Sequence, residues 1–232
     1  MKIRNPHQRL FSLWGCVDRQ HNEWIESEIS GERVLDLGCG YGSLSDFLRR
    51  RGYRSIGIDD GAEFIQIGHQ IFPQTDLRVT HAERLDFQDD FFDAVILKDV
   101  MHHLYKESDC YKALSEIRRV LKTGGTLVVF DPNPHWILRM GRKLIRHQDP
   151  ECTCEQAQEI LRETGFEVSR VRFYESVGLL LSGGYVGWRL CPNFQLFNGL
   201  AVKINARLTR IINRIGLGRN FLFRYSIKAV KA

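Results

Sequence analysis

The chain has 232 residues, of which 43% are hydrophobic, and a formal net charge of +5. This length supports one hydrophobic core, so we expect a single domain over residues 1–232. No apolar run reaches the roughly 20 residues of a membrane-spanning helix, and the first residues lack the apolar region and cleavage site of a signal peptide. We therefore expect a cytoplasmic protein whose six cysteines are free thiols rather than a disulfide framework.

Apolar runs typical of β-strands alternate with amphipathic helical patterns, which predicts an α/β fold with a doubly wound, mostly parallel sheet. An amphipathic stretch at 9–29 precedes the first strand. One later helix is expected to continue through Leu121 and to stop at the left-handed pair Gly124 and Gly125. The strands are expected at residues 33–37, 54–58, 77–81, 92–97, 126–130, 167–174 and 221–230.

The stretch VLDLGCGYGSLSDFL, residues 34–48, joins the first strand to a helix through a glycine-rich turn. Its GxGxG spacing leaves the backbone bare, so a ligand can lie against it. The dinucleotide fingerprint GxGxxG needs a third glycine where this chain has Ser43, and Asp36 would lie against a phosphate. Asp59 ends the next strand, where a carboxylate can accept both hydroxyls of a ribose. The turn and this acid together favour a ribose-containing ligand that is cationic rather than anionic.

At this point residues 33–132 resemble the class I S-adenosylmethionine-dependent methyltransferases. The matching blocks are VLDLGCGYG, GIDDGAEFI, HAERLDFQDDFFDAVILKDVMHHL and ALSEIRRVLKTGGTLVVFDP, in family order. The resemblance implies a Rossmann-like, seven-stranded sheet whose antiparallel last strand is inserted beside the sixth. It implies S-adenosylmethionine as cofactor, with a cofactor-binding core at 31–132. Lid helices would occupy 1–30, and substrate-side helical insertions 133–165 and 178–220.

The resemblance also implies which residues contact the cofactor. Asp59 would hold the ribose, and Asp60 would share or replace that role. At the end of the third strand the family often has an acid before a small residue, whereas this chain has His81, Ala82 and Glu83; the adenine contact is therefore open among them. The candidate cofactor-binding residues are Asp36, Gly38, Cys39, Gly40, Asp59, Asp60, Ala82, Glu83, Lys98, Asp99 and His103.

A catalytic base is expected after the fourth or fifth strand, because open α/β sheets form their clefts at the carboxyl ends of strands. His102 and His103 follow the fourth strand, and imidazole titrates in the useful range. The alternative is that they cap the loop and pack on the cofactor. Asp131 follows the fifth strand, as a base or as a cap of the turn before Pro132.

Three potential metal ligands lie close together in the sequence, at His147, Cys152 and Cys154. No fourth ligand stands at zinc-site spacing, so no metal is predicted.

Two segments are basic and amphipathic, at 136–147 and 199–219. In the second, leucines and isoleucines share one helical face beside a stripe of cations. Such helices can lie on an anionic membrane surface, which would make the protein peripheral to the membrane. Alternatively they cap the substrate cleft or form a dimer face with solvated arginines. Nucleic acid is disfavoured, since no RNA-binding module is visible.

The expected function is S-adenosylmethionine-dependent methyl transfer to a small molecule, hydrophobic or lipid-linked, with Trp14, His21 and Trp24 in a lid over the cofactor. An NAD-dependent oxidoreductase is disfavoured by the GxGxG spacing. A non-catalytic module that binds the cofactor, or a partner through its basic helices, is the alternative outside the enzymes. The sequence leaves open the oligomeric state and whether oxygen, nitrogen or carbon accepts the methyl group.

Overall fold

The computed structural model describes residues 12–107, 110–136, 138–140, 150–182 and 195–232. The chain divides into two compact units. The sheet unit comprises residues 25–132, 150–171 and 225–232. The helical unit comprises the described parts of 1–24, 133–149 and 172–224. Residues 1–11 of the predicted lid, together with 141–149 and 183–194 of the predicted insertions, lie outside the described residues, as does His147.

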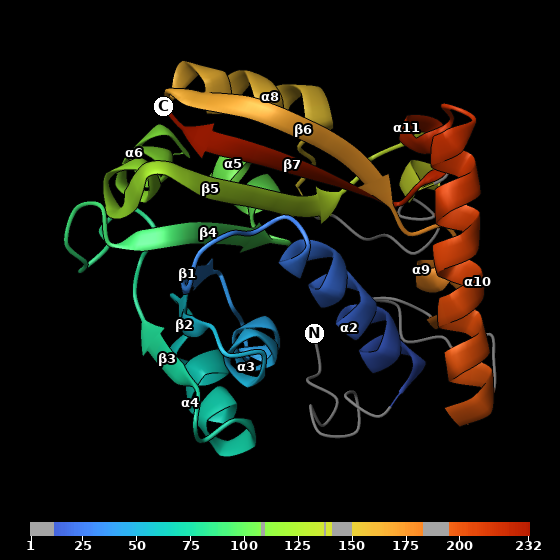
Figure 1. The fold of residues 1–232 in the computed structure, drawn as a ribbon, viewed down its shortest axis with the longest axis horizontal. Helices are drawn as coiled ribbons and strands as arrows, with labels where there is room; N and C mark the ends of the chain where they lie inside the picture. Colours follow the sequence, from blue (N-terminus) through green and yellow to red (C-terminus); the bar gives the residue numbers. More distant parts are fainter. Residues whose placement is uncertain (1–11, 108–109, 137, 141–149, 183–194) are drawn as a thin grey trace. The chain divides into compact units, whose positions relative to one another are not determined.

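The sheet has seven strands in the order β3-β2-β1-β4-β5-β7-β6 (Figure 1). β7 runs antiparallel to its neighbours β5 and β6, and the other described pairs are parallel. The predicted fold class, including the antiparallel last strand beside the sixth, is therefore confirmed. The strands are β1 (Arg33–Leu37), β2 (Arg54–Asp59), β3 (Asp76–Val79), β4 (Phe92–Lys98), β5 (Leu121–Pro132), β6 (Phe166–Tyr174) and β7 (Arg224–Lys231).

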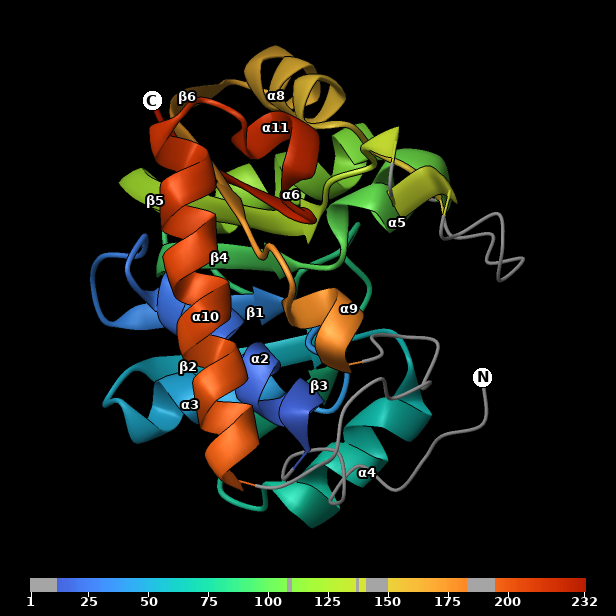
Figure 2. The same ribbon diagram turned by 90° about the vertical axis from the view of Figure 1, so that its right-hand side faces the viewer.

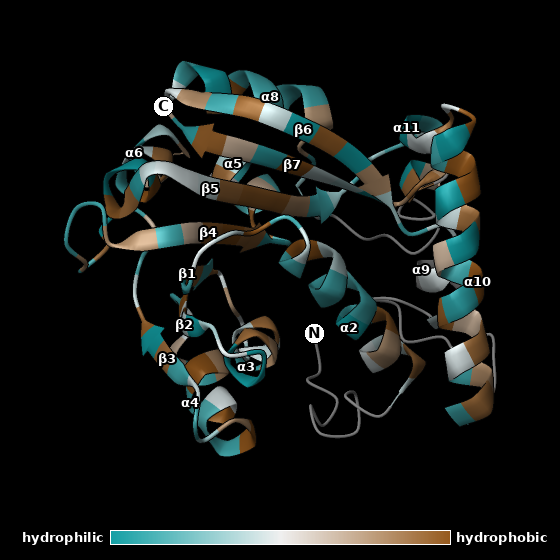
Figure 3. Ribbon diagram, in the orientation of Figure 1, coloured by the Kyte–Doolittle hydropathy of each residue, from teal (hydrophilic) through white to brown (hydrophobic). Residues whose placement is uncertain are grey.

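The central strands are apolar along most of their length because helices cover both faces of a parallel sheet. Residues 94–97 of β4 and 127–130 of β5 are fully buried, and both strands are mostly hydrophobic in Figure 3. α8 begins at a capping box formed by Thr153 and Gln156 and lies along β6 (Figure 1). The helices of the sheet unit are α3 (Ser43–Arg50), α4 (Ala62–Ile71), α5 (Met101–Glu107), α6 (Cys110–Val120) and α8 (Cys154–Glu163).

Two predicted boundaries were wrong. α6 ends at Val120, and β5 begins at Leu121, which pairs with Phe92 ahead of a register shift. Gly124 is left-handed as expected, with φ +74°, but it bends the start of β5 instead of ending the helix. β7 begins only at Arg224, because residues 218–221 form the short helix α11.

The helices of the helical unit pack around a small hydrophobic core. It contains α9 (Gly178–Ser182), α10 (Gln195–Arg214), α11 (Gly218–Phe221) and most of α2 (Leu13–Glu26). Figure 2 shows α9 and α11 beside the long α10. Leu13 and Val17 of α2 pack with Ala201 of α10 in this core.

Candidate functional site

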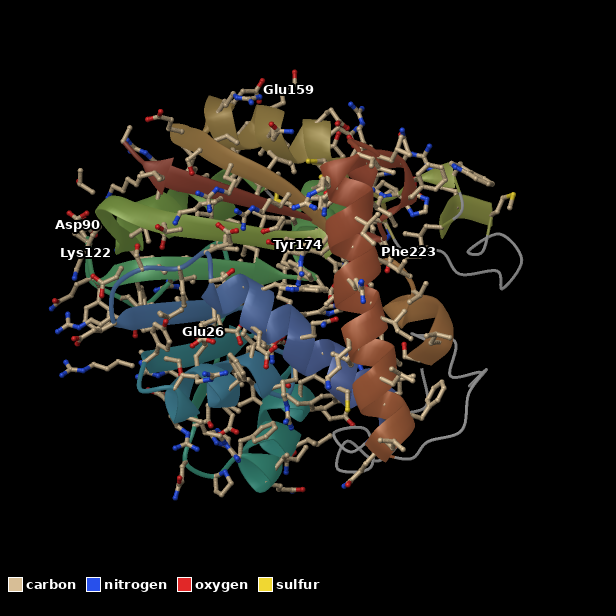
Figure 4. All side chains as sticks on the ribbon, turned by 45° about the vertical axis from the view of Figure 1, so that its right-hand side comes forward. Glu26, Asp90, Lys122, Glu159, Tyr174 and Phe223 are labelled. Atoms are coloured by element: carbon tan, nitrogen blue, oxygen red, sulfur yellow. The ribbon has the colours of Figure 1, made fainter. Side chains whose placement is uncertain are left out.

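The carboxyl ends of the five parallel strands β1 to β5 lie at one edge of the sheet unit. Leu37 of β1 lies opposite Ile58 of β2 and Leu97 of β4. Because the strands end in register, the loops that follow them converge, as in ligand sites of open α/β sheets. At the opposite edge lie two ion pairs, Lys122 with Asp93 and Lys231 with Asp90; Figure 4 labels Lys122 and Asp90. The carboxyl edge is therefore where a site can be built.

The glycine turn after β1 is held by its own backbone donors. The amide nitrogens of Gly38 and Cys39 donate to the carbonyl oxygen of Ile58, at 2.8 and 2.9 Å. Gly40 N donates to Asp59 Oδ2 at 2.8 Å. These N–H groups are thus already used, and the turn does not present them to a phosphate.

Gly38 and Gly40 are both left-handed, with φ of +72° and +54°, but their surroundings differ. A Cβ on Gly38 would lie 2.3 Å from Val100 Cγ2, so glycine is required there for packing. Among the described residues, no atom lies within 4 Å of a Cβ built on Gly40. Open space therefore stands over Gly40, beside the carboxylate of Asp59, where a ligand can approach.

Asp59 has a fixed orientation at the end of β2. Its Oδ2 accepts from Gly40 N, and its Oδ1 accepts from Gly61 N at 2.9 Å. Each carboxylate oxygen has more than one lone-pair site, so both can accept a further hydrogen bond. This half-buried carboxylate suits the two hydroxyls of a ribose. Asp60 is exposed and takes no part in this network.

Asp36 is buried beneath the turn, with a side chain only 1% exposed. Ser45 Oγ donates to Asp36 Oδ2 at 2.6 Å, which joins α3 to β1. Burial raises the pKa of Asp36 to about 6, although the bond from Ser45 and the positive charge of Lys98 oppose the shift. Cys39 stays a thiol, because burial raises its pKa well above its usual range.

The remaining predicted cofactor residues follow β3 and β4. Ala82 and Glu83 lie in a turn after β3 and are half-buried, as are Lys98 and Asp99 at the end of β4. Asp99 adopts φ +59°, which is unusual for a residue with a side chain, and its amide nitrogen donates to the carbonyl oxygen of Phe130. Strained backbone of this kind is frequent at ligand sites.

The two histidines after β4 occupy different environments. His102 is buried, and its Nδ1 lies 2.9 Å from Oδ2 of the buried Asp131. His103 is exposed, with its ring centroid 4.2 Å from that of His102. Of the three predicted catalytic residues, only His103 is therefore exposed, while Asp131 and His102 are buried against each other.

Two aromatic residues beside Asp59 were missed from the sequence. Tyr41 in the glycine turn and Phe64 in α4 form an edge-to-face pair with centroids 5.2 Å apart. Phe64 is 39% exposed although it is large and apolar, and its ring would meet a Cβ on Gly61. An exposed aromatic ring next to Asp59 suits a flat, apolar part of a ligand. The sequence could have indicated both residues, because each is an aromatic residue within a glycine-containing block, Tyr41 in VLDLGCGYG and Phe64 in GIDDGAEFI.

The helical unit contains a buried ionic cluster that the sequence did not predict. Glu175 Oε2 lies 3.3 Å from His21 Nε2 and 3.1 Å from Arg224 Nε, and all three side chains are at most 3% exposed. Trp24 stacks on Tyr174 at 4.7 Å, and Figure 4 labels Tyr174. His21, predicted as a lid residue, is thus buried in this unit, and Trp24, also predicted as a lid residue, is half-buried against Tyr174. The sequence could have drawn attention to Glu175, because it is the last acidic residue of the chain.

Comparison with known proteins identifies the core. A family model described as a methyltransferase domain matches residues 35–129. An uncharacterized methyltransferase of Mycobacterium tuberculosis is 31% identical over 125 residues, which cover 52% of this chain and 50% of the relative. A fatty-acid O-methyltransferase of Mycolicibacterium smegmatis is 34% identical over 129 residues, covering 52% and 44%. The matched region thus spans only about half the length of these relatives.

A solved structure of a similar fold extends the likeness over most of the chain. The crystal structure of an S-adenosylmethionine-dependent methyltransferase from Archaeoglobus fulgidus has a TM-score of 0.65 and covers 93% of each chain at 19% identity. This solved structure shows the fold of the chain, whereas the family model and the relatives match its core in sequence. Residues 35–129 therefore match the methyltransferase domain family, and the resemblance to the class I S-adenosylmethionine-dependent methyltransferases is confirmed for this core.

Proposed function

We propose that the protein transfers a methyl group from S-adenosylmethionine to a small acceptor that is hydrophobic or lipid-linked. The observation that carries the proposal is the pairing of Asp59 with the open turn at Gly40. The carboxylate is oriented by two backbone donors, Gly40 N and Gly61 N, beside space that no described side chain fills. That arrangement fits the ribose of a nucleoside whose remaining parts lie along the turn.

The hydrogen bonding of the turn distinguishes this cofactor from a dinucleotide. A nicotinamide dinucleotide brings a pyrophosphate, which needs backbone N–H groups directed at it. Here Gly38, Cys39 and Gly40 donate to Ile58 and Asp59 instead. S-adenosylmethionine has no phosphate, and its sulfonium is cationic, so the acidic surroundings of the turn favour it. The same observation disfavours an oxidoreductase.

Methyl transfer needs side chains that orient the acceptor and, where necessary, remove its proton. The bound cofactor supplies a methyl group on a sulfonium, which is a good leaving group. The chain must align the acceptor and, where necessary, accept its proton. We assign the proton acceptor to the exposed His103. The buried pair of His102 and Asp131 fixes the turn that carries it, and so His102 and Asp131 are positioning residues.

The class of acceptor is inferred from a relative. The similar fatty-acid O-methyltransferase acts, by its name, on an acyl chain carrying a carboxylate. An acceptor of that kind is apolar and is poorly soluble as a free molecule. This supports a hydrophobic or lipid-linked acceptor here, with oxygen as the first atom to test.

The experiment is a calorimetric titration of the purified chain with S-adenosylmethionine, with its demethylated product, and with NAD as the control. Micromolar binding of the first two and none of NAD is expected. Asp59→Ala should weaken S-adenosylmethionine binding by at least about tenfold, or about 1.4 kcal/mol. Labelled cofactor would then be used to search lipid extracts for a methylated product. Tight cofactor binding without any product would favour the non-catalytic module.

A further inference from the structure

The long helix α10 buries small and uncharged polar residues and exposes large apolar ones. Its buried residues are small or polar, namely Asn198, Ala201, Asn205 and Thr209. Its exposed large apolar residues are Leu196 (86%), Leu200 (54%), Ile204 (43%) and Ile211 (48%). Helices on the surface of soluble proteins normally have the opposite arrangement. Some partner for the exposed face is therefore needed.

The orientation of α10 is fixed by specific contacts within the helical unit. Asn205 Oδ1 accepts from the amide nitrogens of residues 176, 177 and 178, at 2.9, 3.0 and 3.1 Å. Asn205 Nδ2 donates to Gln20 Oε1 at 2.7 Å. Ala201 packs against Leu13 and Val17. Rotating the helix to bury its leucines would break these bonds, so the apolar face is held outward.

Cations run along the exposed face beside the apolar stripe. Lys203, Arg207, Arg210 and Arg214 are all exposed, and none forms an ion pair with a described residue. At 3.6 residues per turn they lie next to Leu200, Ile204 and Ile211 and away from Asn205. No Asp or Glu occurs anywhere in residues 176–232. The face thus combines apolar side chains with uncompensated positive charge.

We propose that the exposed face of α10 docks on an anionic lipid bilayer. Leu200, Ile204 and Ile211 would enter the headgroup boundary, and the four cations would meet lipid phosphates. A second copy of the chain fits the face less well, since a two-fold interface would bring the same cations together. None of the described helices is long and apolar enough to cross a bilayer, so α10 lies in the plane of the membrane surface.

The test is sedimentation of the full chain with phosphatidylcholine vesicles containing about one third phosphatidylglycerol, and with pure phosphatidylcholine vesicles. Wild type should sediment with the anionic vesicles, weakly with the neutral ones, and less as salt rises. Arg207→Glu combined with Arg214→Glu should lower the partition coefficient at least about tenfold. Leu200→Ser combined with Ile211→Ser should lower it by a similar factor, because apolar insertion is lost.

Matched controls lie on the sheet unit. Arg54→Glu with Arg162→Glu makes the same change of net charge at exposed sites, and Val79→Ser with Tyr111→Ser removes comparably exposed apolar side chains. Both should sediment like wild type. The proposal is overturned if wild type fails to sediment, or if the controls lose as much binding as the α10 variants. It is also overturned if sedimentation velocity shows a dimer that Leu200→Ser with Ile211→Ser dissociates while vesicle binding persists.

Discussion

His102 and Asp131 form a buried pair in which one carboxylate oxygen accepts twice. Asp131 Oδ2 lies 3.0 Å from His102 N and 2.9 Å from His102 Nδ1. The pair ties the start of α5 to the end of β5. His103, the next residue, has its side chain in solvent. Two adjacent histidines thus lie in different environments, one buried against Asp131 and one exposed, and only the exposed one is proposed here as a proton acceptor.

Removing Asp131 should therefore destabilise the fold, whereas removing His103 should not. Asp131→Ala leaves the backbone N–H and the imidazole of the buried His102 without their hydrogen-bond acceptor. We therefore expect a loss of about 3 kcal/mol in the free energy of unfolding. His103→Ala should change it by less than about 1 kcal/mol, as at other exposed positions. Urea unfolding measures both. With an acceptor in hand, His103→Ala should lower kcat by about 100-fold or more. Equal destabilisation by the two variants would contradict this division.

Alanine at Gly38 and at Gly40 should have different effects. Gly38→Ala should destabilise the protein by about 3 kcal/mol, because the new methyl would overlap Val100 on a left-handed backbone. Gly40→Ala meets no atom, so it should cost only about 1 kcal/mol. Its methyl would stand in the proposed ligand space, and cofactor affinity should fall at least about tenfold.

Gly52→Ala is the matched control for Gly40→Ala. Gly52 is also left-handed, with φ +94°, and a methyl group added there would also have nothing within 4 Å. Gly52→Ala should lose as little stability as Gly40→Ala. Its affinity for the cofactor, measured by calorimetry, should be unchanged. If Gly40→Ala binds the cofactor as tightly as Gly52→Ala, the ligand does not lie over Gly40.

The raised pKa of Asp36 predicts how stability depends on pH. Its pKa is about 6 in the folded protein against 3.8 when unfolded, so between these values the folded state binds more protons. Stability must then fall as pH rises from about 4 to about 6, by up to about 3 kcal/mol from this group. Asp36→Asn should be more stable than wild type above pH 6 by about 2 kcal/mol, since the buried amide has a smaller cost of its own.

Urea midpoints of wild type and Asp36→Asn across this range are the measurement. Below pH 4, where Asp36 is protonated in both states, wild type should be the more stable by about 1 kcal/mol, so the two curves should cross within this range. Ser45→Ala serves as a second variant. It removes a bond that favours the ionised carboxylate, so it should shift the window to higher pH. Parallel curves for wild type and Asp36→Asn would mean that Asp36 is not responsible.

The sequence predicted the strands well where burial alone decides them. The predicted range 33–37 is the observed β1, because an apolar run between Glu32 and the glycine turn allows no other boundary. The start of β5 was missed, since Leu121 is apolar and is buried equally well at the end of a helix or the start of a strand. The pairing with Phe92, which decides the matter, is a contact between distant residues.

The residue types at the site were predictable, whereas their partners were not. Asp59 and Gly40 were identified from spacing, but the bond between them arises from the parallel alignment of β1 and β2. The sequence also marked the apolar face of α10 without indicating its direction. Periodicity shows that Leu200, Ile204 and Ile211 share a face, and only the bonds of Asn205 show that this face points outward.

Asn205 should accordingly be the most sensitive position in α10. Asn205→Ala leaves the amide nitrogens of residues 176–178 without their acceptor, and we expect a loss of about 3 kcal/mol or more in the free energy of unfolding. Asn205→Asp keeps an acceptor for these three amides, although it loses the bond to Gln20 and buries a carboxylate. Hydrogen exchange of residues 176–178 gives a local readout, because Asn205→Ala should remove their protection and Asn205→Asp should keep it. Slow exchange of these amides in Asn205→Ala would show that α10 is held by packing at Ala201 instead, and that the outward apolar face does not depend on Asn205.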